Sequence, residues 1–173
     1  MGKYEIWTIG HSTRSFSEFL ELLKKNRIET LVDVRSMPGS RKFPYFDREQ
    51  LELHLPEHGI RYVHSDGLGG RRKGKKDSVH TAWRNASFRA YADYMETDGF
   101  KKALEDLKFL AGESSVCMMC SEAVWWRCHR SMISDILKVQ KWQVWHILST
   151  TKVEAHPYTS AAVIKYGCLI YHN

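Results

Sequence analysis

Ser115-Val116-Cys117-Met118-Met119-Cys120-Ser121-Glu122 is an apolar run that ends in a thiol and a carboxylate. The run has the length of a buried strand, and Cys128-His129-Arg130 follow where helical spacing begins. A cysteine between a strand and a helix can be ionised by the helix N-terminus and by nearby cations. The segment therefore predicts a buried strand whose end carries a reactive site.

Strand-like and helix-like segments alternate on both sides of this stretch. Runs rich in β-branched, aromatic and other apolar residues predict strands at 4–9, 30–34, 60–63, 116–119 and 142–148. Apolar residues at helical spacing predict helices at 16–23, 47–55, 87–110 and 131–139, the third divided near Asp98-Gly99. This alternation predicts an α/β fold, a single domain in which a mainly parallel sheet of about five strands is flanked by helices in a Rossmann-like three-layer arrangement.

The length of the chain predicts one domain over 1–173. We expect 151–173 to be either a C-terminal extension or an edge hairpin around Lys165-Tyr166-Gly167. No run of about 18 apolar residues occurs, so no membrane partner is expected. Four cysteines without secretory features are typical of reduced thiols in a cytosolic protein, which predicts a cytoplasmic location.

The net charge of +6 is concentrated in one short segment, which we call the basic loop. Five cations lie within six residues: Arg71, Arg72, Lys73, Lys75 and Lys76. The basic loop is either a solvated turn or a binding site for an acidic partner such as phosphate or nucleic acid.

Ionisable residues follow the carboxyl end of every expected strand. They lie in Gly10-His11-Ser12, Asp33-Val34-Arg35, His64-Ser65-Asp66, Cys120-Ser121-Glu122 and at His146. Because ligands of open parallel sheets bind outside the carboxyl ends of the strands, this convergence predicts a binding or active site there. Structural alternatives stay open: Asp33 and Arg35 can form an ion pair, and His146 can lie in the core.

Cys120 is the candidate nucleophile of this site. Arg127, His129 or Arg130 near a helix start can lower the pKa of its thiol. The alternative is a packing or ligand-contacting role for Cys120.

Zinc binding is disfavoured, although Cys117, Cys120, Cys128 and His129 are all soft ligands. Residues i and i+3 of a strand point to opposite faces, so Cys117 and Cys120 should diverge. The same geometry argues against a redox pair of these two cysteines. We therefore expect no metal and no cofactor.

Four motifs together resemble the domain of unknown function 488 family. They are Thr8-Ile9-Gly10-His11-Ser12, Asp33-Val34-Arg35 with Pro38, Leu68-Gly69-Gly70, and Cys120-Ser121-Glu122 ahead of Cys128-His129-Arg130. The resemblance, over about 4–160, implies a compact cytoplasmic α/β domain and no particular chemistry, because the family has no established activity. The positions typical of the family are His11, Ser12, Asp33, Arg35, Gly69, Cys120, Glu122, Cys128, His129 and Arg130.

Two functions from different classes fit these residues. The first is an enzyme that acts on an anionic substrate, phosphate-bearing, nucleotide or nucleic acid, at the carboxyl ends of the strands. Its catalytic groups are Cys120 as nucleophile, or Glu122 and His11 as acid–base pair. Its arginines hold the anion, and its predicted substrate-binding residues are Ser12, Asp33, Arg35, Gly69, Cys128, His129 and Arg130.

The alternative is a non-catalytic nucleic-acid or nucleotide-binding module. In this module the basic loop would follow the phosphates, while Trp83, Trp125 or Trp126 would stack on bases.

Overall fold

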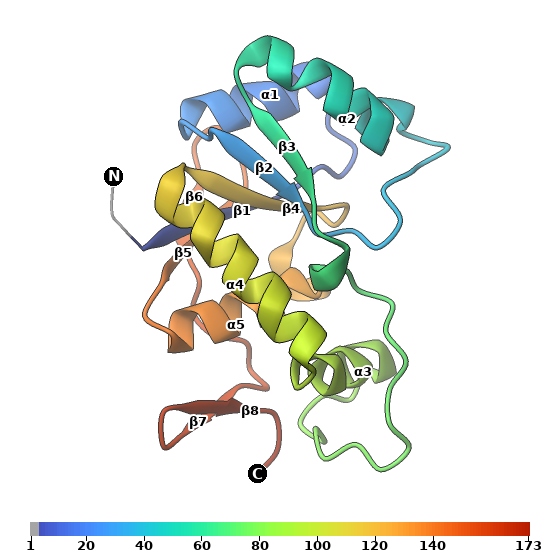
Figure 1. Cartoon of the computed structure of the whole chain (residues 1–173), viewed down its shortest axis with the longest axis vertical. Coiled ribbons are helices and arrows are strands. Elements are labelled where there is room, and N and C mark those ends of the chain that lie inside the picture. The colour runs from blue at the N-terminus through green and yellow to red at the C-terminus, as the bar shows by residue number, and fades with distance from the viewer. Residues whose placement is uncertain (1–3) are drawn as a thin grey trace.

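The computed structural model describes residues 4–173, so the first three residues of the domain expected over 1–173 lie outside the described part. At the centre of the protein is a six-stranded sheet in the order β3-β2-β4-β1-β5-β6 (Figure 1). The strands are β1 (Glu5–Gly10), β2 (Thr30–Asp33), β3 (Arg61–His64), β4 (Val116–Cys120), β5 (Gln143–Ile147) and β6 (Val153–Ala155). The first five strands pair in parallel, which confirms the predicted α/β fold.

The sixth strand, β6, was not predicted. It pairs antiparallel with β5 at one edge of the sheet. It is three residues long, and Val153 and Ala155 are exposed. A strand this short has too few residues to show a period-2 pattern.

Helices cover both faces of the sheet and give the protein three layers (Figure 1). One face packs against α1 (Phe16–Lys25) and α2 (Arg48–His54). The other face packs against α3 (Ala86–Met95), α4 (Asp98–Glu113) and α5 (Arg130–Val139).

β4 lies between β2 and β1 and is buried on both faces. Met118 and Cys120 pack in the core beside α3, α4 and α5, whereas Cys117 and Met119 pack in the core beside α1 and α2. Burial of each methionine contributes about 1.5–3 kcal/mol, which explains an uninterrupted apolar run rather than an alternating one. The alternation also confirms that Cys117 and Cys120 face opposite sides of the sheet.

The helix boundaries follow from local hydrogen bonds. Ser15 caps α1 by accepting a hydrogen bond from Glu18 N (3.1 Å), as expected for this position. The long helical region divides before Asp98, because Thr97 caps α4 by accepting from Phe100 N (3.3 Å). Asp47 precedes α2 but does not cap it with its side chain: Asp47 Oδ1 instead accepts from Ser40 N (2.7 Å).

The last part of the chain forms a second, two-stranded sheet. β7 (Val163–Lys165) and β8 (Cys168–Ile170) pair antiparallel around Tyr166 and Gly167, which both have positive φ. The hairpin lies apart from the main sheet, below α5 in Figure 1. Tyr171, directly after β8, is buried.

Among residues 4–173, no helix is both long and apolar enough to span a lipid bilayer.

Candidate active site

The ends of three neighbouring strands open into one cavity of about 770 Å³. Because β4 lies between β2 and β1, the segments that follow these strands meet at the carboxyl edge of the sheet. Of the predicted site residues, the cavity wall contains His11, Ser12, Arg35, Arg71, Cys120, Glu122, Cys128 and His129. The others lie outside this wall: Asp33, Gly69, Arg72, Lys73, Lys75, Lys76 and Arg130.

Gly10 lets the end of β1 lie directly against the segment that follows β4. His11 N donates to Cys120 O (2.9 Å) and Ser12 N donates to Ser121 O (3.0 Å), so the strand pairing continues beyond the strands. A Cβ atom on Gly10 would lie 1.7 Å from Glu122 O. Only glycine fits this close approach, which places His11 beside the end of β4.

Arg35 is oriented by a buried carboxylate. Its Nε and Nη2 donate to Asp33 Oδ1 (2.9 Å) and Oδ2 (2.8 Å), and Nη2 also donates to Phe46 O (2.7 Å). Asp33 is fully buried and accepts a further hydrogen bond from Tyr62 OH (2.6 Å). The third guanidinium nitrogen, Nη1, lies 3.4 Å from His11 Nε2 in the cavity wall. Asp33 thus acts behind Arg35, and the guanidinium presents a fixed donor toward the cavity.

His11 is a neutral imidazole with one defined tautomer. Its Nδ1 donates to Ser12 O (2.9 Å), so Nε2 keeps its lone pair toward Arg35. Burial lowers the pKa of His11, the Ser12 hydrogen bond opposes this, and the Arg35 charge lowers the pKa further. The ring also stacks on Phe46 at 4.4 Å between centroids. Both ring nitrogens therefore have partners within the protein, which fixes the orientation of His11 in the cavity wall.

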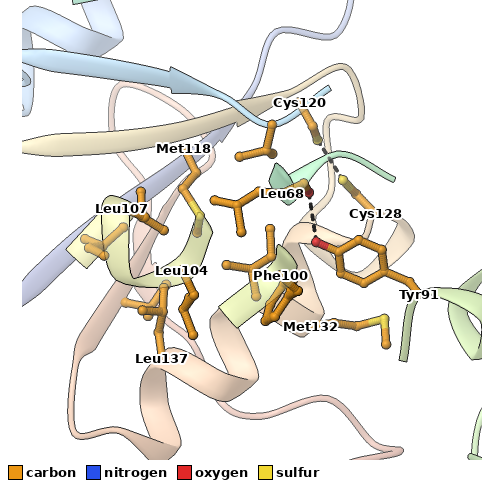
Figure 2. Packing of buried hydrophobic residues seen from close by; sticks show 14 of the residues in the cluster. Leu68, Tyr91, Phe100, Leu104, Leu107, Met118, Cys120, Cys128, Met132 and Leu137 are labelled. Carbon is orange, nitrogen blue, oxygen red and sulfur yellow. Dashed lines mark hydrogen bonds between the residues drawn. The ribbon is translucent and has the colours of Figure 1, made fainter. Parts of the chain in front are cut away.

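Cys120 and Cys128 form a close pair in the wall of the cavity (Figure 2). Their Sγ atoms are 2.9 Å apart and share a hydrogen bond. Cys120 is 1% exposed and Cys128 is 6% exposed, so both are reached only through the cavity. The fold thus joins two thiols that are eight positions apart in the sequence.

The surroundings of the two thiols shift their pKa values in opposite directions. Cys128 Sγ also lies 3.5 Å from the backbone N–H of Arg130, the first residue of α5. Burial raises the pKa of Cys128, but the hydrogen bond with Cys120, the charge of Arg130 and the Arg130 N–H together outweigh burial, and the pKa is lowered. Burial and the hydrogen bond with Cys128 raise the pKa of Cys120 well above its ordinary value. Of the two thiols, Cys128 is therefore the one whose surroundings favour the ionised form, whereas the surroundings of Cys120, the predicted nucleophile, favour the protonated form.

His129 lies next to Cys128. Its Nε2 donates to Val34 O (2.8 Å), which leaves Nδ1 as an acceptor 3.5 Å from Cys128 Sγ. Burial lowers the pKa of His129, so the ring is neutral at pH 7. It can accept the proton of Cys128 and return it to a leaving group.

Glu122 contributes its backbone to the site more than its side chain. Its carbonyl oxygen accepts from Arg130 Nη2 (2.6 Å), while the side chain is exposed at the cavity. Within the described chain no hydrogen bond joins the Glu122 carboxylate to His11. The acid–base pair of these two residues thus has less geometric support than the cysteine pair.

Arg130 points into the protein and away from the cavity. It is 1% exposed; Nη1 donates to Thr8 Oγ1 (3.1 Å), and Nη2 donates to Glu122 O and, at 3.4 Å, to Ala123 O. Arg130 Nε has no partner within residues 4–173. The guanidinium fixes the segment after β4 and supplies positive charge behind the cysteine pair.

A single row of hydrogen bonds, which we call the buried chain, links Arg130 to Asp135. Arg130 Nη1 donates to Thr8 Oγ1, Thr8 donates to His146 Nδ1 (2.6 Å), His146 Nε2 donates to His156 Nδ1 (2.8 Å), and His156 Nε2 donates to Asp135 Oδ1 (2.7 Å). The direction follows from the two ends, because Arg130 only donates and the Asp135 carboxylate only accepts. Burial is the main cause that lowers the pKa of His146 to about 2, and the charge of Arg130 acts in the same direction.

Two strand ends do not contribute to the cavity. His146 on β5 is fully buried in the buried chain. His64 on β3 donates from Nε2 to Arg35 O (2.7 Å) and supports the backbone of the site. Polar residues at the ends of all five strands were expected to meet at one site. Those after β1, β2 and β4 do so.

The basic loop is partly occupied by contacts within the protein. Arg72 lies 3.9 Å over the ring of Tyr94, and Lys75 Nζ lies 3.5 Å from Glu96. Arg71 is exposed and lines the cavity. Lys73, Lys75 and Lys76 are exposed outside the cavity wall.

Gly69 and two of the tryptophans have packing roles. A Cβ atom on Gly69 would lie 2.6 Å from Ser36 Oγ, so this glycine allows the 67–70 segment to lie against the segment after β2. Trp125 is buried and stacks on His146 at 4.7 Å, and Trp83 packs edge-on against Phe88. Trp126 is half-exposed.

Some wall residues were not predicted from the sequence. Lys42, in the segment between β2 and α2, adds a cation, and Tyr91 of α3 closes the wall beside His129. The adjacent Arg41 and Lys42 give a weak charge signal. Tyr91 gives no such signal in the sequence, because its position in the wall depends on the packing of α3.

One group of side chains outside the cavity has the composition of a metal site. Ligand atoms of His80, Asp93 and Glu96 lie within 4.8 Å of one another. However, both Asp93 oxygens already accept hydrogen bonds, from Ser78 Oγ and from Lys75 N, and Lys75 Nζ approaches Glu96. These contacts describe an internal polar cluster that anchors the basic loop to α3.

The fold and the site together define a class: an α/β protein with a cysteine pair in a cationic cavity at the carboxyl edge of a parallel sheet. The chain belongs to the DUF488 family, because the model of this domain of unknown function matches residues 15–137. This confirms the resemblance, over a shorter range than 4–160, and leaves His11 and Ser12 outside the matched residues. No curated protein matches the chain, and no solved structure does.

Proposed function

We propose that the cavity is the active site of an enzyme that uses the Cys128 thiolate as its nucleophile on a small anionic substrate. One observation carries this proposal: Cys128 Sγ faces the first N–H of α5 and hydrogen-bonds to Cys120 inside a cavity with cationic walls. A helix N-terminus and a neighbouring proton donor favour the thiolate, which is the reactive form of cysteine.

The charges around the cavity support an anionic substrate. The wall holds four cationic side chains, those of Arg35, Lys42, Arg71 and Arg127. In the described part of the wall, Glu122 supplies the one carboxylate. Arg35 is held in place by Asp33, so binding an anion costs little side-chain entropy.

The non-catalytic nucleic-acid module has less support. Arg72 and Lys75 are engaged within the protein, and Trp83 and Trp125 pack inside it. In addition, a protein does not need a pair of thiols to bind the phosphate backbone of a nucleic acid. We place the enzyme in a reducing compartment, the cytoplasm, where its thiols stay reduced.

The test is selective alkylation of Cys128 in a Cys168→Ser background, with anionic iodoacetate and neutral iodoacetamide. We expect Cys128 to titrate below the ordinary thiol value of roughly 8.5 and to prefer iodoacetate relative to a free thiol. Arg35→Met should remove the preference, whereas Arg61→Met, at an exposed position on β3 outside the wall, should keep it. Arg71→Met, at an exposed position in the wall, gives the same information if Arg35→Met fails to fold.

An ordinary titration of Cys128, or equal rates with both reagents relative to the free thiol, would overturn the proposal.

A further inference from the structure

Cys128 does not need a second thiol beside it to act as a nucleophile. We propose that Cys120 and Cys128 reduce a small anionic disulfide and alternate between the dithiol and the disulfide form as they do so. This inference rests on the proposed function, because Cys128 is the same nucleophile and the cavity holds the same class of anion. A thiolate alone suffices for transfer of an acyl or phosphoryl group. A second thiol at 2.9 Å instead offers a direct way to resolve a mixed disulfide on Cys128.

The fold brings the two sulfurs close to bonding distance. A disulfide has an S–S length of about 2.0 Å, so the pair needs to close by roughly 1 Å. The connecting segment is anchored at Trp125, whose ring stacks on His146 and whose Nε1 donates to Glu154 (2.9 Å). These contacts of Trp125 fix the segment between the two cysteines, and so they hold the two thiols close together.

The reaction balances in two exchange steps. In the first, Cys128 S⁻ attacks one sulfur of the substrate R–S–S–R, which forms Cys128–S–S–R and releases R–S⁻. In the second, Cys120 loses its proton and attacks Cys128 Sγ, which forms the Cys120–Cys128 disulfide and releases the second R–S⁻. Two electrons pass from the protein to the substrate, and excess thiol reductant returns the protein disulfide to the dithiol by the reverse exchanges.

A proton acceptor lies beside Cys128, the sulfur from which the second R–S⁻ departs. His129 Nδ1 lies 3.5 Å from Cys128 Sγ and carries a lone pair, because Nε2 donates to Val34 O. From this position it can relay a proton to the thiolate that departs from Cys128. A thiol leaves more readily when its sulfur is protonated in this way.

The cavity selects the class of disulfide. Cys120 and Cys128 are nearly inaccessible except through the cavity, which favours low-molecular-weight disulfides over those of folded proteins. The wall cations favour substrates with carboxylates. Oxidised glutathione is an anionic probe of this class, and bis(2-hydroxyethyl) disulfide is a neutral one.

The remaining cysteines serve as internal controls. Cys117 is buried on the opposite face of the sheet, where burial raises its pKa. Cys168 is exposed on β8, so it is replaced by serine in every variant tested.

The experiment is a stoichiometric titration of the reduced protein with oxidised glutathione, followed by mass spectrometry and thiol counting. We expect the Cys168→Ser protein to lose two thiols, release two glutathiones and carry a Cys120–Cys128 disulfide without an adduct. Cys120→Ser should instead release one glutathione and retain the other on Cys128, and Cys128→Ser should not react. The neutral probe should react more slowly by about tenfold or more, because it gains nothing from the wall cations.

Failure of this inference is distinguishable from failure of the proposed function. A stable glutathione adduct on Cys128 in the protein with both cysteines would overturn the redox step and leave the nucleophile intact. An unreactive Cys128 would overturn both. Because the thiol count on the Cys168→Ser protein decides the point, the test remains valid if Cys120→Ser does not fold.

Discussion

At the scale of single residues, the site depends on groups that do not touch a ligand. Asp33 is fully buried and orients Arg35, and Gly10 has no side chain at all. Removing one partner of such a buried ion pair typically costs about 3–5 kcal/mol, because the other charge stays buried and unpaired. The residues that line the cavity are therefore held in place by residues that lie behind its wall.

Gly10→Ala should destabilise the protein strongly, because its Cβ would lie 1.7 Å from Glu122 O. We expect a loss of at least about 2 kcal/mol in the free energy of unfolding. Gly112→Ala is the matched control: nothing lies within 4 Å of its Cβ position in α4, and alanine favours a helix. It should stabilise the protein by about 0.5–1 kcal/mol. Urea denaturation measures both, and equal effects of the two variants would contradict the structure.

At the scale of elements, α5 joins the reactive pair to the end of the chain. Its first residue, Arg130, donates an N–H to Cys128, and Asp135, one turn and a half further on, closes the buried chain. Asp135 also accepts from Thr159 Oγ1 (2.5 Å) and Tyr171 OH (2.8 Å). One helix therefore contacts both Cys128 and the C-terminal segment.

Asp135→Asn should loosen the C-terminal segment, because an amide replaces one acceptor oxygen with a donor. We expect a loss of about 3 kcal/mol in stability and faster hydrogen exchange over 156–171. Asp106→Asn, at an exposed position paired only with Lys102, should change stability by less than about 0.5 kcal/mol. Unchanged exchange over 156–171 in Asp135→Asn would show that the buried chain does not hold this segment.

Most elements are predictable from the sequence because their signals are local. The apolar run of β4, the Ser15 cap of α1 and the spacing of α5 each depend on neighbouring residues. Strand order is not local. The sequence therefore predicts a rim of ionisable groups, but it does not show which of the five strand ends meet at the cavity, and those of β1, β2 and β4 do. The roles of Cys120 and Cys128 depend on one N–H of α5 and a 2.9 Å contact, which no spacing rule specifies.

At the scale of the whole molecule, buried neutral histidines make the fold sensitive to acid. The pKa of His146 is lowered from 6.5 to about 2 in the folded protein, chiefly by burial. Below pH 6.5 the unfolded chain binds a proton that the folded protein excludes, so stability is present above this pH and is lost as the pH falls. His11 and His129, whose pKa values are also lowered, act in the same direction.

The free energy of unfolding should therefore fall between pH 7.5 and pH 5. His146 alone contributes a loss of about 2 kcal/mol over this range. Urea denaturation at both pH values measures the difference. His146→Gln should reduce the pH dependence, whereas His58→Gln, at an exposed position, should not. Equal stability of the unaltered protein at the two pH values would contradict the buried, neutral state of His146.

The buried chain also shows which truncations of the protein would disrupt its fold. Thr8 and His146 lie on strands outside residues 15–137, and His156 lies beyond them as well. A recombinant piece limited to the matched residues would leave Arg130 and Asp135 as two buried charges with nothing between them. It would also lose β1, so that β4 would become an edge strand with its apolar residues open to pairing with other chains. The limits of the family match are therefore not the limits of a stable folding unit, and such a piece should aggregate.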